Sequence, residues 1–225
     1  HDNISRTKQA LRFMKNFDIL LCAGDILNGF EPIKDFKKTY QQFAKIFETY
    51  PYCFLVPGNH EIMDENQTLG ELERFSIHKK SVEINGLKIF GYGGGVNPPA
   101  NGPDSRLYTP KTIYKTDANE LDYLLSEYGQ KVDILLLHDI KGLEEVVKKH
   151  EPEIVITGHD HEQGRETIIG TDTEWIKCGP IVPFDERNVR LFGKSCYAFI
   201  ESEGEAIRIG LSYFETNRRL RKILI

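Results

Sequence analysis

Short, almost wholly apolar runs recur along the chain, and each of them ends at a glycine or a polar residue. Four of these runs have the length of β-strands, residues 17–22, 52–56, 132–137 and 153–157. Nearly continuous apolar character is typical of strands that are buried on both faces of a sheet. The pattern therefore predicts an open α/β sheet.

Segments with helical spacing separate the strands. Phe36, Tyr40, Phe43 and Phe47 recur on one face of a helix over residues 34–48, and this spacing predicts an amphipathic crossover helix that packs its apolar face on the core. Further helices are predicted over residues 4–14, 116–128 and 142–150. We interpret the last two as scaffolding around the sheet.

Antiparallel strands are predicted elsewhere. Residues 76–91 alternate between apolar and polar positions and turn at Asn85-Gly86, the strongest hairpin signal in the chain. The sheet should therefore be mixed. After residue 161 the pattern changes to short strands with turn residues between them, which suggests a second sheet packed on the first, with strands at 165–169, 174–178, 195–201 and 206–214.

Composition limits the class of protein. A chain of 225 residues with 40% hydrophobic and 28% charged residues fits a single globular domain over residues 1–225. Its apolar stretches are shorter than the roughly 20 residues that span a bilayer, so we expect no membrane anchor. A net charge of −5 disfavours broad binding to nucleic acid. The oligomeric state stays open.

The four cysteines and the first residue carry two further expectations. No CxxC spacing occurs, and Cys22 and Cys53 lie in apolar strand runs, so we predict buried free thiols and a cytoplasmic protein. The chain begins at His1 rather than Met. We expect a preceding strand that this sequence lacks, because an open sheet needs that central strand.

Six polar residues follow the apolar runs and have the chemistry of metal ligands or their neighbours. They are Asp25 in CAGD, Asn59 and His60 in PGNHE, His138 in LLLHD, and His159 and His161 in TGHDH. Ligands of open α/β sheets lie outside the carboxyl ends of the strands, so these side chains should converge. Imidazole, carboxylate and amide donors without thiolate suit a catalytic site for Mn²⁺, Fe, Ni²⁺ or Zn²⁺.

Five motif blocks occur in order along the chain, at His1, 24–25, 58–61, His138 and 158–161. Together they resemble the motifs of the calcineurin-like metallophosphoesterases. The resemblance covers about residues 1–161 and implies a four-layer αββα sandwich of two mixed sheets flanked by helices. It also implies two divalent metal ions, with Mn²⁺ favoured, and a hydroxide that bridges them as the nucleophile. The family's first aspartate, two places before His1, is not in this sequence.

The resemblance assigns a role to each matching position. His1, Asp25 and His161 would hold the first metal, and the second would be held by Asp25, Asn59, His138 and His159. Asp25 would bridge both ions. His60 would face the phosphate, stabilise developing charge and donate a proton to the leaving oxygen.

The substrate is less well defined. Protein phosphatases of this family have an arginine after the bridging aspartate, whereas this chain reads GDILNGF, so phosphoprotein substrates are disfavoured. A small phosphodiester or phosphomonoester remains. The Gly- and Pro-rich segment 93–110 could line the pocket, and its Arg106 could bind a substrate phosphate.

Alternatives accompany these assignments. The fold also occurs in protein-binding scaffolds that have lost their metal ligands, although the retained ligand set favours an enzyme. His138 taken alone could be a strand-end histidine bound to the backbone. Asp2, Glu61 and Asp160 could orient imidazoles or simply be solvated. His78 and His150 match no motif, so surface or capping roles are predicted for them.

Overall fold

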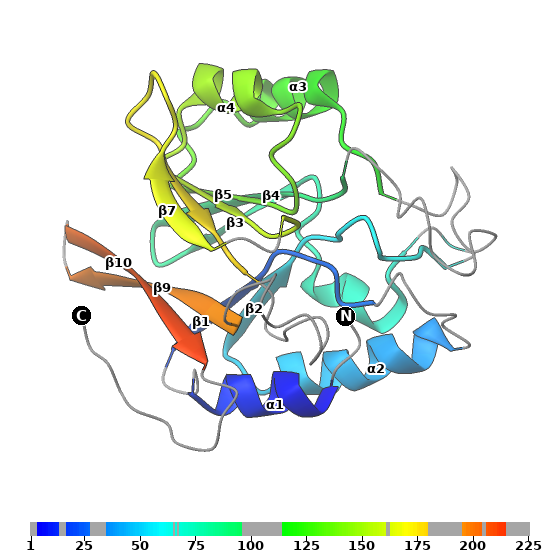
Figure 1. The fold of residues 1–225 in the computed structure, drawn as a ribbon. Helices are drawn as coiled ribbons and strands as arrows, with labels where there is room; N and C mark the ends of the chain where they lie inside the picture. The colour runs from blue at the N-terminus through cyan, green and yellow to red at the C-terminus, as the bar shows by residue number, and fades with distance from the viewer. Residues whose placement is uncertain are drawn as a thin grey trace.

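A six-stranded mixed sheet lies at the centre of the protein in a computed structural model (Figure 1). The structure describes residues 4–13, 17–27, 35–64, 66, 68–95, 114–160, 163–179, 195–203 and 206–214. Its helices are α1 (Ile4–Phe13), α2 (Phe36–Phe47), the 3-10 helix η1 (Gly70–Phe75), α3 (Ala118–Tyr128) and α4 (Glu144–His150). Its strands are β1 (Ile19–Cys22), β2 (Tyr52–Leu55), β3 (Lys80–Ile84), β4 (Leu87–Tyr92), β5 (Ile134–Leu137), β6 (Ile154–Thr157), β7 (Gly164–Thr167), β8 (Glu174–Lys177), β9 (Ser195–Glu203) and β10 (Ala206–Phe214).

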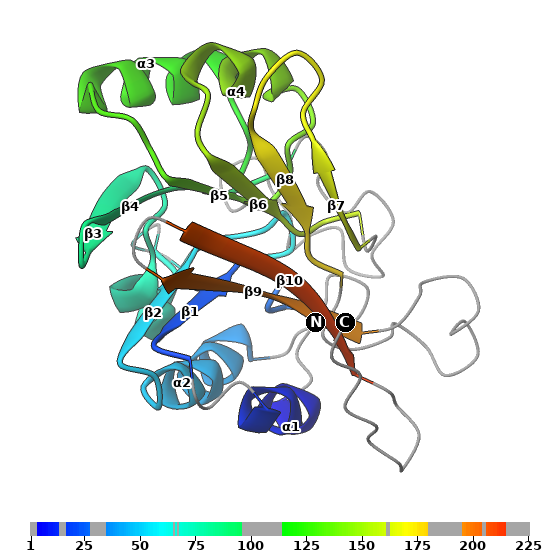
Figure 2. The ribbon, with the colours of Figure 1, turned by 90° about the vertical axis from the view of Figure 1, so that its left-hand side faces the viewer.

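The six-stranded sheet has the order β3-β4-β5-β6-β8-β7, with β4, β5, β6 and β8 parallel and the edge strands β3 and β7 antiparallel. Helices α3 and α4 cover one face of it (Figures 1 and 2). All four residues of β5 are buried. Alternate residues contact different cores, because Leu135 and Leu137 pack toward the helices while Ile134 and Leu136 lie in a cluster on the other face.

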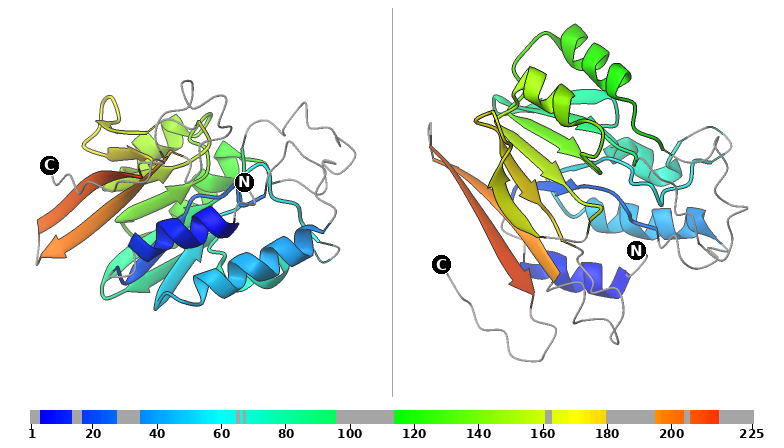
Figure 3. Two further views of the ribbon diagram at one scale, coloured as in Figure 1. Left: turned by 60° about the horizontal axis from the view of Figure 1, so that its bottom comes forward. Right: turned by 45° about the horizontal axis from the view of Figure 1, so that its top comes forward.

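A second, smaller sheet packs on the other face. Strands β1 and β2 pair in parallel, and their Leu21 and Phe54 contact the core that contains Ile134 and Leu136. Helices α1 and α2 lie side by side on the outer side of this strand pair (Figures 2 and 3). The aromatic face of α2 is buried there, as its spacing predicts, and Asp35 caps its first turn by accepting a hydrogen bond from Lys38 N at 3.0 Å.

The predicted strands and helices are confirmed to within about two residues at their ends, except that the hairpin predicted from residue 76 begins at Lys80. The hairpin at Asn85-Gly86 joins β3 and β4, with Asn85 and Gly86 both at positive φ as a tight hairpin turn requires. Burial of β1 differs from the prediction, because all four of its residues are only half-buried. Its Cys22 is half-buried and its neighbour Cys53 is buried, and both are free thiols.

The predicted second sheet is wrong in its membership. Strands β7 and β8 belong to the first sheet, where β8 pairs in parallel with β6. The physical reason is that β8 satisfies the open hydrogen-bonding edge of β6 and buries Ile176 completely in the same core as Ile154 and Ile156. In the part of the chain that the structure describes, the second sheet consists of the two parallel strands β1 and β2, so it is not mixed as predicted, and β9 and β10 form a separate antiparallel pair.

Among the helices that the structure describes, none combines the length and apolar character needed to cross a membrane.

Candidate metal centre

The candidate ligands lie where parallel strands end. Asp25 follows β1, Asn59 and His60 follow β2, His138 directly follows β5, and His159 follows β6. These four strands belong to two sheets that face each other, and their carboxyl ends meet at one edge of the molecule. Residues that are up to 115 positions apart in the sequence come into contact there, as between His138 and Ala23. The convergence predicted from the sequence is therefore found for these residues.

Four donor atoms from different loops form a compact group. His138 Nε2 lies 3.4 Å from Asp25 Oδ1, 3.0 Å from Asn59 Oδ1 and 3.1 Å from His159 Nδ1. His159 Nδ1 lies 3.2 Å from Asn59 Oδ1. Asn59 and His138 are buried, whereas the His159 side chain is 26% exposed. The group is thus reached by solvent from the side of His159.

These separations fit a shared metal ion. Two ligands that each lie about 2.1 Å from one ion are about 3.0 to 3.4 Å apart in octahedral or tetrahedral geometry. The measured separations between donor pairs fall within this range. One oxygen or nitrogen from each of Asp25, His138 and His159 lies within 4.8 Å of the other two, so this trio could hold an ion.

The hydrogen of the His138 ring is located by its backbone partner. His138 Nδ1 lies 2.5 Å from the carbonyl oxygen of Ala23. A carbonyl oxygen only accepts hydrogen bonds, so Nδ1 carries the ring hydrogen. Nε2 therefore has a free lone pair, which faces the candidate ligand atoms of Asp25, Asn59 and His159. The backbone bond that was the alternative to a ligand role is therefore present, and it orients Nε2 toward the candidate metal position.

His60 lies at the border of the donor group. Its Nε2 is 3.9 Å from Asp25 Oδ2, and its backbone N–H donates to Asp25 Oδ1 at 3.2 Å. Burial lowers the pKa of His60, and the Asp25 carboxylate partly offsets this effect. Burial raises the pKa of Asp25, but the neighbouring His138 and His60 outweigh burial and hold that pKa below its ordinary value.

Glu61 is not the solvated residue that was one of its two predicted possibilities, and its hydrogen bonds are to backbone groups rather than to an imidazole. It is fully buried, and its carboxylate accepts hydrogen bonds from Asp25 N at 2.8 Å, Leu27 N at 3.0 Å and Gly58 N. Burial raises the pKa of Glu61, and the nearby Asp25 charge raises it further. Glu61 thus joins the loop after β1 to the loop after β2 through backbone groups.

Two candidate ligands have an unusual backbone conformation. Asp25 has φ of 56° and His159 has φ of 63°, both in the left-handed region. Residues other than glycine rarely adopt it, and it costs roughly 1–2 kcal/mol. Gly24, with φ of 89°, precedes Asp25 and packs against the backbone of Gly58 so closely that a side chain would overlap it. Such strained turns cluster at functional sites.

His78, for which a surface or capping role was predicted, is half-buried and packs against Tyr92 and Tyr114. Its ring centroid is 5.5 Å from that of Tyr92 and 5.1 Å from that of Tyr114. His78 Nδ1 accepts the N–H of Gly93 at 2.9 Å. Burial lowers its pKa from 6.5 to about 4. The next residue, Gly94, donates its N–H to Pro57 O at 2.8 Å. His78 therefore holds the segment 93–94 that packs against the loop containing Asn59.

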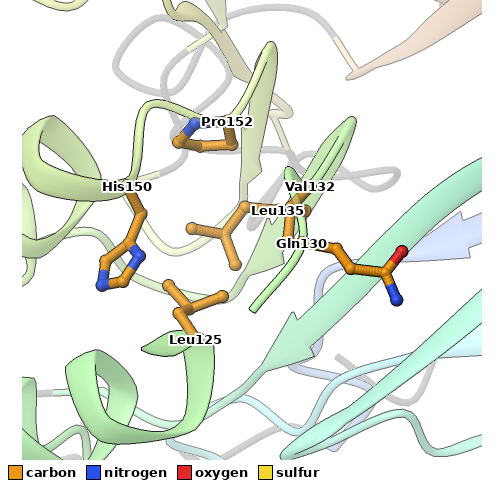
Figure 4. Close-up of a pocket in the computed structure, with 6 residues that line it drawn as sticks. All are labelled: Leu125, Gln130, Val132, Leu135, His150 and Pro152. Atoms are coloured by element: carbon orange, nitrogen blue, oxygen red, sulfur yellow. The ribbon is translucent and has the colours of Figure 1, made fainter. Parts of the chain in front are cut away.

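A small recess lies beside the amino ends of β5 and β6 (Figure 4). It is lined by Leu125, Gln130, Val132, Leu135, His150 and Pro152. These residues surround the amino ends of β5 and β6, whereas His138 and His159 follow the carboxyl ends. His150, predicted as a capping or surface residue, contacts Asp122 Oδ1 at 2.6 Å. The recess is therefore separate from the donor group.

Four candidate site residues lie outside the residues that the structure describes. They are His1, Asp2, Arg106 and His161. Most of the predicted 93–110 loop lies outside them as well, and only its first three residues, 93–95, are described. The first of the two predicted metal positions is thus represented only by Asp25.

The sequence comparison identifies the family. The profile of the calcineurin-like phosphoesterases matches residues 1–163, which is well over half of the 225 residues. The chain belongs to the calcineurin-like phosphoesterase family, and the resemblance seen in its motifs is confirmed. No curated protein is significantly similar to the chain in sequence.

The fold is similar to those of solved structures at low sequence identity. Sulfate thiohydrolase SoxB from Thermus thermophilus, solved in complex with glycerol, has a TM-score of 0.57 and 9% identity over 94% of this chain and 42% of SoxB. A putative 5'-nucleotidase from Staphylococcus aureus has a TM-score of 0.48 and 14% identity, over 79% of this chain and 43% of the nucleotidase. A predicted phosphoesterase from Streptococcus pneumoniae has a TM-score of 0.45 and 13% identity, over 95% of this chain and 84% of the phosphoesterase. The chain spans less than half the length of the first two proteins.

Proposed function

We propose that the protein is a metal-dependent phosphoesterase that hydrolyses a small phosphodiester or phosphomonoester. The observation that carries this proposal is the convergence of Asp25, Asn59, His138 and His159, whose donor atoms lie 3.0–3.4 Å apart in the pairs described. Membership of the calcineurin-like phosphoesterase family supports it. We also propose that residues 1–225 form one cytoplasmic domain with the αββα layering of that family.

The residues present fit a divalent ion that binds nitrogen and oxygen. Asp25, Asn59, His138 and His159 would hold one ion, and His1 and His161 would complete a second site around Asp25. We favour Mn²⁺, with Fe, Ni²⁺ and Zn²⁺ as alternatives. When bound, such ions lower the pKa of a water nucleophile and neutralise phosphate charge.

The chain's own residues would orient the substrate and move a proton. Asp25 is anchored by its contacts with His138 and with the backbone of His60, so its carboxylate has a fixed direction. His60 Nε2, 3.9 Å from Asp25, lies at the border of the donor group. We propose that it faces the phosphate and donates a proton to the leaving oxygen. Arg106 is proposed as a phosphate contact on the basis of the sequence alone.

The test separates metal binding from proton donation. Protein stripped of metal is supplied with Mn²⁺, Ni²⁺ or Zn²⁺ and assayed with bis-p-nitrophenyl phosphate and p-nitrophenyl phosphate. Metal-dependent turnover is expected. His60→Ala should lower turnover by about 10²–10⁴-fold with its metal content unchanged. Asp25→Asn should lose metal and turnover together.

Three results would contradict the proposal or one of its parts. A His60→Ala protein as active as the wild type would remove His60 from the reaction. Asp25→Asn protein that retains the wild-type metal content would contradict the bridging role of Asp25. A protein that binds no metal would favour the alternative of a protein-binding scaffold, which does not need the donor group.

A further inference from the structure

We propose that Asp139 is a positioning residue for His159, which it holds with Nδ1 directed at the candidate metal position. This inference rests on the proposed metal centre and names a residue that no sequence motif assigned. Asp139 directly follows His138 at the end of β5. An acidic residue in the run LLLHDI, between buried apolar positions, is the sequence signal that could have identified it.

The two carboxylate oxygens of Asp139 have different partners. Its side chain is 3% exposed. Oδ1 accepts the N–H of Lys141 at 2.9 Å, and this bond fixes the direction of the carboxylate. Oδ2 is buried, accepts no hydrogen bond from the part of the chain that the structure describes, and lies 3.7 Å from His159 Nε2. A buried acceptor without a hydrogen bond is costly, so a partner is expected.

The ring of His159 lies between this carboxylate and the donor group. Nδ1 faces His138 Nε2 at 3.1 Å and Asn59 Oδ1 at 3.2 Å, while Nε2 faces Asp139. A metal ion can bind Nδ1 only if the ring hydrogen is on Nε2. A carboxylate accepts hydrogen bonds and donates none, so Asp139 favours that arrangement of the ring.

A small movement would allow His159 Nε2 to donate a hydrogen bond to Asp139 Oδ2. A separation of 3.7 Å is longer than a direct bond, and a shift of the ring by about 1 Å would close it. The His159 side chain is 26% exposed, so it is less confined than the buried His138. Asp139 itself is held in place by Lys141 N, and therefore the movement falls to His159.

Asp139→Asn is a sharp test because Asn has one acceptor and one donor group. Its amide oxygen would be retained by the N–H of Lys141, which occupies Oδ1 in the wild type. The amide NH₂ would then face His159 Nε2 and favour a hydrogen on Nδ1, which blocks metal binding. Asp160→Asn is the matched control, because Asp160 is exposed, adjoins His159 and loses the same charge.

The first measurement is the affinity of the full chain for Zn²⁺, determined by calorimetry in competition with a chelator. Asp139→Asn should bind about 10–100-fold more weakly than the wild type, and Asp160→Asn should stay within about twofold of it. Circular dichroism and urea unfolding of the metal-free proteins check that each variant is folded.

The second measurement needs no variant and does not depend on activity. In zinc-loaded wild-type protein with ¹⁵N-labelled histidine, two-bond ¹H–¹⁵N spectra should show His159 with zinc on Nδ1 and a protected hydrogen on Nε2. Zinc on Nε2 would overturn the inference, as would equal affinities for wild type and Asp139→Asn. A wild-type protein that binds no Zn²⁺ would instead refute the metal centre itself.

Discussion

Acid should destabilise the protein through His78. Its neutral ring lies between Tyr92 and Tyr114 and accepts the N–H of Gly93, so Nδ1 cannot be protonated without loss of that hydrogen bond. Burial is the main cause of its low pKa, and the charge of Lys79 adds to it. Lys80 lowers the pKa further, while Glu120 opposes these effects.

The size of the effect follows from the change in pKa. In the folded protein the pKa of His78 falls from 6.5 to about 4. A folded-state pKa below the unfolded value contributes stability that is complete above pH 6.5 and is lost as the pH falls toward 4. The full contribution is about 3 kcal/mol, of which about 2 kcal/mol is lost between pH 7.5 and pH 5.

Urea unfolding followed by the fluorescence of Trp175, with a chelator present, would measure this loss. Wild-type and His78→Gln protein are compared at pH 7.5 and pH 5, because Gln can still accept the Gly93 N–H but does not titrate. Other titrating groups cancel in the comparison. The free energy of unfolding of the wild type should fall by about 2 kcal/mol more than that of the variant. Equal falls, within about 0.5 kcal/mol, would refute this account of His78.

Two further changes probe the loops around the candidate metal centre. Glu61→Gln should lower the free energy of unfolding by about 1–3 kcal/mol and weaken Mn²⁺ binding, because an amide NH₂ would face backbone N–H groups. Urea unfolding of the metal-free variant that is unchanged from the wild type would refute this role of Glu61. Gly24→Ala should be more destabilising than Gly170→Ala in the same urea assay, because φ is similar at 89° and 87° but only Gly24 would bring its new side chain against another backbone; equal losses would contradict the packing argument.

Much of the fold could be predicted from the sequence because its signals are local. The Asn85-Gly86 turn and the aromatic face of α2 depend on neighbouring residues, and both are found as predicted. The membership of β8 could not be predicted, because it depends on which distant strand edge remains open. The half-buried state of β1 likewise depends on what covers it, which residues 17–22 do not encode.

In the candidate site, too, the local features could be predicted from the sequence and the contacts with distant residues could not. Strand ends followed by Asp25, Asn59, His60, His138 and His159 are visible in the sequence, and the structure brings these residues together. The residues that surround His78 and Glu61 are not visible in the sequence. Burial of His78 depends on rings from two distant segments, and the role of Glu61 depends on backbone groups 34 and 36 residues away. Residue type alone could not distinguish these from solvated side chains.

The two strained candidate ligands are held in different ways, and this difference should affect how binding of a metal ion would couple to stability. The turn at Asp25 is fixed by backbone hydrogen bonds to the buried Glu61, which exist without metal. The contacts of His159 run through its ring, toward His138 and Asn59 on one side and Asp139 on the other. If a metal ion binds to Nδ1, that bond would therefore offset the backbone strain at His159 more than a bond to Asp25 would offset the strain there. By linkage, metal binding should stabilise the backbone conformation of His159 more than that of Asp25.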